Sequence, residues 1–67
     1  MEFVEKARVR LEHWIHHSDH HNEEYEMFAD QLEEAGKTES AAYVREMIDL
    51  TSKSTECLKN ALKALDK

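Results

Sequence analysis

The chain has 67 residues with five His, one Cys, and nine Lys and Arg against fifteen Asp and Glu, giving a formal net charge of −6. A chain this short forms one domain at most and buries little surface, so we expect association or a bound metal to supplement its core. The negative charge opposes binding to phosphate backbones and anionic lipids, which argues against nucleic-acid and membrane partners.

The first predicted element is a long helix over about residues 3–35. Proline is absent and Gly36 is the only glycine, so nothing interrupts a helix before that point. Apolar side chains recur at spacings of three and four, the period of one helix face. They are Val4, Ala7, Leu11, Trp14, Tyr25, Phe28, Leu32 and Ala35. The same register puts Ser18 and His21 at core positions, and we expect Trp14 and Tyr25 to pack in the layers beside them.

A short turn is predicted at residues 36–38. Gly36 suits the left-handed conformation that often closes a helix, and Lys37 places positive charge near the carbonyl end. Thr38 followed by Glu39 is typical of an N-cap and a first helical turn. Because the turn is short, the two helices should run antiparallel.

The second predicted helix covers about residues 39–65 and carries two apolar stripes. The stripe facing the first helix consists of Ala41, Val44, Ile48, Thr51, Thr55, Leu58, Leu62 and Leu65. The stripe on an adjacent face consists of Tyr43, Met47, Leu50, Cys57, Ala61 and Ala64. One partner helix cannot cover both stripes. The predicted fold class is therefore all-α, an antiparallel two-helix hairpin that forms a homodimeric four-helix bundle.

Polar residues interrupt both inner stripes at the same height. Folding the chain about Gly36 places position 18 opposite about 55, and position 21 opposite 51 or 52. Ser18, Thr51 and Thr55 would then form a polar layer. Such a layer either fixes the register through hydrogen bonds or holds a metal or small ligand, and the sequence leaves both interpretations open.

The candidate functional residues lie between Leu11 and Gly36, a stretch that has no Lys or Arg and holds all five histidines. Its negative field concentrates cations. On a helix, His17, His21 and Glu24 fall in one narrow arc, and two imidazoles with a carboxylate suit zinc, nickel, cobalt or iron. A second usable stripe combines His17 and Glu24 with His13 and His20, while His16 lies furthest from the arc.

Other interpretations of these histidines remain. They could lie on the surface without a ligand, or sense pH, and the second apolar stripe could dock a protein partner in an interaction module. An enzyme is not expected, because the chain has no His-Glu-x-x-His or Glu-x-x-His motif and no glycine-rich phosphate loop. The single Cys57 cannot form an internal disulfide, and no apolar run resembles a signal peptide or a membrane span. A cytoplasmic protein is expected.

The run from Trp14 to Tyr25 resembles a group of short prokaryotic helical-hairpin domains with the pattern Trp-Ile-x-His-Asn-x-x-His-x-x-Glu followed by an aromatic residue. These domains occur alone or attached to histidine-rich proteins linked with nickel and cobalt handling. The resemblance points to His17, His21 and Glu24, with His13 and Trp14 upstream. Ser18 replaces the Asn of the pattern, so a hydroxyl stands where the polar layer would have an amide.

A weaker likeness is to hemerythrin, whose metal-binding helices space histidines and carboxylates by four residues before an aromatic residue. This chain has about half the helices that such a site needs, so it would have to dimerise to imitate one. Together these observations predict a small accessory protein that binds nickel, cobalt or zinc for storage, buffering or delivery.

Overall fold

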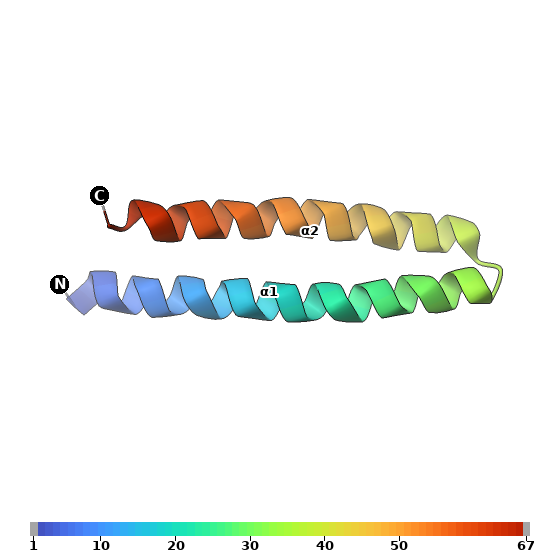
Figure 1. Ribbon diagram of the computed structural model, residues 1–67, viewed down its shortest axis with the longest axis horizontal. Coiled ribbons are helices and arrows are strands. Elements are labelled where there is room, and N and C mark those ends of the chain that lie inside the picture. The colour runs from blue at the N-terminus through green and yellow to red at the C-terminus, as the bar shows by residue number, and fades with distance from the viewer. Residues whose placement is uncertain (1, 67) are drawn as a thin grey trace.

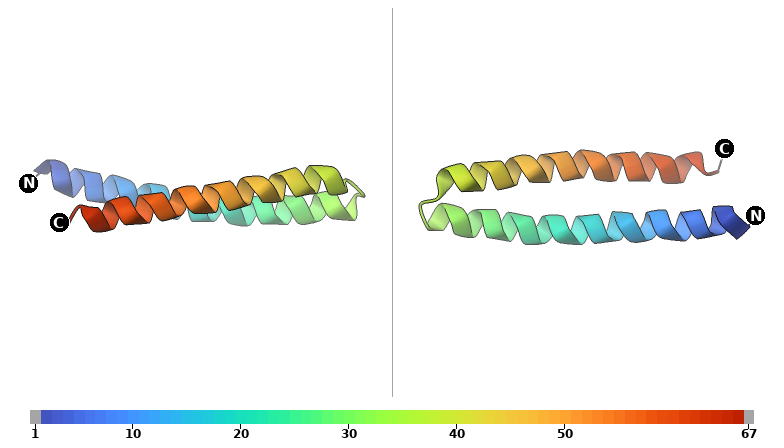
Figure 2. Two further views of the ribbon diagram at one scale, coloured as in Figure 1. Left: turned by 90° about the horizontal axis from the view of Figure 1, so that it is seen from above. Right: turned by 180° about the vertical axis from the view of Figure 1, so that it is seen from behind.

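The computed structural model describes residues 2–66, which form two antiparallel helices, α1 (Glu2–Glu34) and α2 (Thr38–Ala64) (Figure 1). The hairpin is a narrow rod of 53 × 15 × 11 Å, with its two free helix ends at the same end of the rod. Seen from behind, the two helices run side by side, and seen from above they cross at a shallow angle (Figure 2). The predicted all-α hairpin is confirmed, and neither helix is long and apolar enough to cross a membrane.

The turn forms because Gly36 adopts a left-handed conformation with φ of 79°. The Gly36 N–H donates to the Glu33 carbonyl at 2.9 Å and the Lys37 N–H donates to the Leu32 carbonyl at 2.8 Å. These two bonds are the Schellman motif, which satisfies the last carbonyls of a helix. The prediction that Thr38 is the N-cap is wrong by one residue, because Lys37 occupies that position and makes no side-chain capping bond.

The contact between the helices is narrow. Ala29 and Ala41 are fully buried near the turn, Ile48 and Thr55 are buried further along, and no large side chain in residues 2–66 is fully buried. Half-buried residues complete both inner stripes. On α1 they include Val4, Leu11, Ile15, Ser18, Tyr25 and Leu32. On α2 and at its C-cap they include Val44, Thr51, Leu58, Leu62 and Leu65. Two helices alone therefore give this chain a thin core.

The predicted inner stripe of α1 is wrong at three positions, one of which is Ala35, exposed beyond the last residue of the helix. Trp14 is 49% exposed and Phe28 is 52% exposed, whereas Ile15 and Ala29 face α2. The reason is that a seven-residue repeat built on Leu11 can take its second inner position three or four residues later. The structure uses the four-residue step, which moves Trp14 and Phe28 onto the side of the hairpin.

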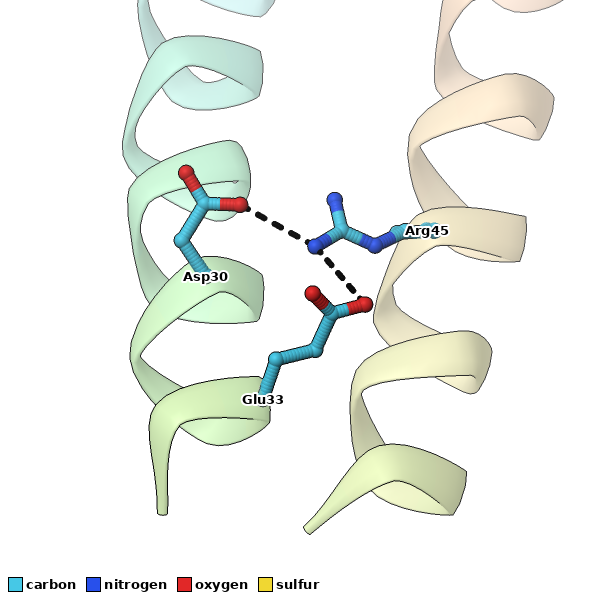
Figure 3. A network of polar contacts seen from close by, with 3 residues as sticks. All are labelled: Asp30, Glu33 and Arg45. Carbon is cyan, nitrogen blue, oxygen red and sulfur yellow. Dashed lines mark hydrogen bonds and ion pairs between the residues drawn. The ribbon is translucent and has the colours of Figure 1, made fainter. Parts of the chain in front are cut away.

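One side of the hairpin carries the polar contacts between the helices. Arg45 Nη2 lies 3.0 Å from Asp30 Oδ1 and 3.2 Å from Glu33 Oε1 (Figure 3). Arg8 pairs with Asp66 near the free ends. Asn22 donates to Ser52 on the same side, at 3.4 Å. Arg45, Ser52 and Asp66 each come directly after an inner residue of α2, so we call this side the polar flank.

The opposite side of the hairpin is apolar. Glu33 and Arg45 each follow an inner residue by one position and meet on the polar flank, so residues that directly precede an inner residue lie on the other side. We call this side the apolar face. Its exposed large side chains include Trp14, Phe28, Tyr43, Met47 and Leu50. The face combines the outer stripe predicted for α2 with the aromatic residues displaced from the inner stripe of α1.

Candidate functional site

The structure brings His17, His21 and Glu24 together along one strip of α1. The rings of His17 and His21 lie on successive helical turns with centroids 4.4 Å apart and planes inclined by 47°. His21 Nδ1 lies 3.3 Å from Glu24 Oε1. His17 and Glu24 are exposed and His21 is half-buried, so all three side chains can be reached from solvent.

The second predicted stripe adds two histidines to this strip. The ring of His13 lies 5.8 Å from that of His17, and His20 Nε2 lies 3.5 Å from Glu24 Oε1. One oxygen of Glu24 thus lies near both His20 and His21. Within residues 2–66 no three His, Cys, Asp or Glu side chains are gathered closely enough to hold a metal ion. One hairpin in this conformation therefore offers its ligands in pairs.

We call the strip formed by His13, His17, His20, His21 and Glu24 the histidine strip. The polar layer lies beside it, in the contact between the helices. Ser18 Oγ lies 2.7 Å from Thr55 Oγ1, and Thr55 Oγ1 donates to the Thr51 carbonyl at 2.9 Å. The Thr51 hydroxyl lies 2.6 Å from Asn22 Oδ1 and 2.9 Å from the Ile48 carbonyl. No buried side-chain N or O atom in the described residues lacks a hydrogen-bond partner. These contacts favour a layer that fixes the register over an internal ligand site.

Asn22 belongs to this layer although it was not among the predicted residues. It, rather than His21, makes the hydrogen bonds to Thr51 and Ser52. The same four-residue step that brings Ile15 inward brings Asn22 inward and turns His21 toward the apolar face. The spacing of four residues between Ser18 and Asn22 could have indicated that Asn22 is the next inner residue. The spacing of three residues between Ser18 and His21 is equally regular, so the sequence did not decide between them.

An open groove of about 350 Å³ joins the histidine strip to the polar layer. Its lining consists of Trp14, His17, Ser18, His21, Asn22, Tyr25 and Thr51. The rings of His21 and Tyr25 stack at 5.9 Å with an angle of 11° between their planes. His17 and His21 thus border a hollow that opens on the apolar face, which gives a ligand direct access to both imidazoles.

Two charge pairs between the helices lie away from this groove, on the polar flank. The hydrogen bond from Arg8 lowers the pKa of the Asp66 carboxyl and raises that of the guanidinium, and the hydrogen bond to Asp30 raises the pKa of Arg45. These exposed pairs connect the two helices. Cys57 is an exposed free thiol on the outer stripe of α2. The histidines, by contrast, contact one another and Glu24 along α1.

Comparison with known proteins gives one result that identifies a family. No curated protein and no solved structure matches the chain. A family model described as "Domain of unknown function (DUF8180)" matches residues 7–65, which include most of α1, the whole turn and all of α2. The chain belongs to this family.

Proposed function

We propose that this protein is a small, non-enzymatic metal-binding accessory protein that stores, buffers or delivers nickel, cobalt or zinc. The proposal depends on one observation. The imidazoles of His17 and His21 lie 4.4 Å apart, and a carboxylate oxygen of Glu24 lies 3.3 Å from the second ring. Two imidazoles and a carboxylate are a ligand set that these metals accept in proteins.

The surroundings of the pair support this function. Glu24 acts either as a ligand or as the group that orients His21, because a carboxylate on Nδ1 leaves Nε2 directed at the metal. His13 and His20 extend the strip toward a larger site. The acidic stretch around the histidines attracts cations, and no Lys or Arg between Leu11 and Gly36 opposes them. The strip is open, which suits exchange of an ion more than catalysis.

The working form in this proposal is a homodimer, with two hairpins packed into a four-helix bundle. The support is the thin core of the single hairpin and the large apolar side chains left exposed beside it. Analytical ultracentrifugation of the untagged protein at micromolar concentration tests this part. A fully helical monomer would contradict it.

The metal function is tested by titration calorimetry with nickel, cobalt and zinc on untagged protein. Replacing His17 and His21 together by Ala should abolish tight binding, because both close imidazoles are removed. His16→Ala is the matched control, since it removes a histidine outside the arc and should leave the affinity nearly unchanged. If the double variant binds as tightly as the parent protein, the site lies elsewhere on the chain.

A second candidate function is a protein interaction module in which the histidines play no part. The exposure of Phe28, Tyr43 and Leu50 on one side of the hairpin favours it, because exposed apolar patches commonly mark binding surfaces. The same titration separates the two functions. A parent protein that binds none of the three metals would leave the interaction module as the better explanation.

A further inference from the structure

The histidine strip of one hairpin is an incomplete metal site. Its side chains approach one another only in pairs, and no third ligand in residues 2–66 joins a pair closely enough to hold an ion. Trp14, His21 and Phe28 are seven residues apart in sequence, so they form one stripe of α1. Whatever covers the apolar face therefore also covers His21.

The apolar face is suited to pairing with a second copy of itself. Its bulky side chains on α2 lie toward the turn and its small ones toward the free end. The bulky residues are Tyr43, Met47 and Leu50, and the small ones are Cys57, Ala61 and Ala64. Two such faces fit when one is reversed end to end, because bulky residues then pack on small ones. A second copy in the same direction would stack bulky residues on bulky residues.

The reversed arrangement has a two-fold axis through the middle of this stripe, between Leu50 and Cys57. The polar layer fixes which part of α1 lies at that height, because Thr51 bonds to Asn22 and Thr55 lies 2.7 Å from Ser18. The axis therefore passes between His17 and His21. With a rise of about 1.5 Å per residue, the imidazoles of both copies fall within roughly 6 Å along the bundle.

We infer that the metal site is shared between two copies of the chain. In this assembly α1 packs antiparallel on α1 of the second copy, and His17 of each copy lies opposite His21 of the other. Four imidazoles then surround one transition-metal ion, and Glu24 orients His21 through the contact seen in each hairpin. This inference rests on the proposed metal function and adds its stoichiometry and its dependence on dimerisation.

The first test is the stoichiometry of zinc binding, measured by calorimetry together with the mass of the complex by ultracentrifugation. The shared site predicts one ion per two chains and a dimer that becomes tighter when zinc is present. One ion per chain bound to a monomer would overturn the inference while leaving the metal function in place. A parent protein that binds no zinc, nickel or cobalt would overturn the metal function itself.

The second test breaks the apolar face without touching a histidine. Leu50→Glu should give a helical monomer whose zinc affinity falls by about tenfold or more, because half of the ligands are lost. Met27→Glu is the matched control, since Met27 is 67% exposed and Leu50 is 59% exposed, but Met27 lies outside the apolar face. Both variants add one negative charge, which attracts cations, so charge cannot explain a loss. An unchanged affinity in monomeric Leu50→Glu would overturn the inference.

Discussion

Thr55 is the clearest case in which a single polar side chain is buried with its partners present. It is 4% exposed, contacts Ser18 Oγ at 2.7 Å and donates to the Thr51 carbonyl. The Thr55 hydroxyl donates its one hydrogen to the Thr51 carbonyl within α2. The hydrogen bond between the helices is therefore donated by Ser18 to Thr55. The sequence predicted this pairing of positions 18 and 55, since two interruptions at one height follow from counting residues away from Gly36. It did not predict Asn22, because the phase of the α1 stripe depends on packing against α2.

A double-mutant cycle at Ser18 and Thr55 should reveal their coupling. Thr55→Val keeps the side-chain volume but leaves the Ser18 hydroxyl without its partner on α2, at a cost of about 0.5–1.5 kcal/mol in unfolding free energy. Replacing Ser18 by Ala in that variant removes the orphaned hydroxyl and should cost little more. Urea denaturation of the parent, both single variants and the double variant measures the cycle. Additive single effects would show that the two hydroxyls are not coupled.

Asp66 should make the stability of the hairpin depend on pH. Its hydrogen bond from Arg8 holds the folded-state pKa below the ordinary value, so the stabilising effect is present above about pH 4. It is lost as the pH falls through the lowered folded-state pKa. Asp66→Asn should therefore melt below the parent near pH 7 and together with it in strongly acidic solution. Melting curves across this range, with and without salt, measure the difference. A difference that is constant with pH would contradict the ion pair.

At the scale of the elements, the helices were predicted more accurately than the faces they present. Each helix boundary lies within one residue of its expected position, because one glycine and no proline leave few alternatives. The Thr38 cap was missed because the bond from the Lys37 N–H to Leu32 makes residue 37 the last one before α2. The faces were harder to predict. Trp14 and Ile15 are adjacent in sequence and both apolar, and only contact with α2 decides which of them points inward.

Gly36 should be the most sensitive position of the turn. A Cβ placed there meets no atom within 4 Å, so space does not oppose substitution. The φ of 79° opposes substitution, because a left-handed backbone conformation costs an ordinary residue about 1–2 kcal/mol. Gly36→Ala should lower the unfolding free energy by about 1 kcal/mol, and Gly36→Asn by less, because Asn tolerates this conformation. Denaturation of both variants measures this order. Equal losses for Ala and Asn would contradict the conformational explanation.

At the scale of the whole molecule, the two sides of the rod have different roles. The polar flank joins α1 to α2 through pairs such as Arg45 with Glu33. The apolar face has the opposite character, since its large side chains are exposed and its groove is bordered by His17 and His21. Composition led us to expect association, and the sequence places all five histidines in the first helix. The side of the hairpin on which these features meet became visible only in the folded chain.

Metal binding should therefore increase the free energy of unfolding of the whole molecule. An ion that binds the folded protein and not the unfolded chain adds about 2.7 kcal/mol when its concentration is 100 times the dissociation constant. Nickel, cobalt and zinc should each raise the melting temperature. Magnesium and calcium should not, because they prefer oxygen ligands to imidazole.

The same measurement at two pH values distinguishes imidazole ligands from carboxylates. Protons compete for the nitrogen lone pair that a metal needs, so the increase in melting temperature should be large near pH 7.5 and small near pH 5. Carboxylates alone would still bind at the lower pH, because they remain charged there. The His17→Ala, His21→Ala double variant should show no increase at either pH, whereas His16→Ala should follow the parent protein. An increase that magnesium reproduces, or that persists unchanged at pH 5, would point to the acidic residues and away from the histidine strip.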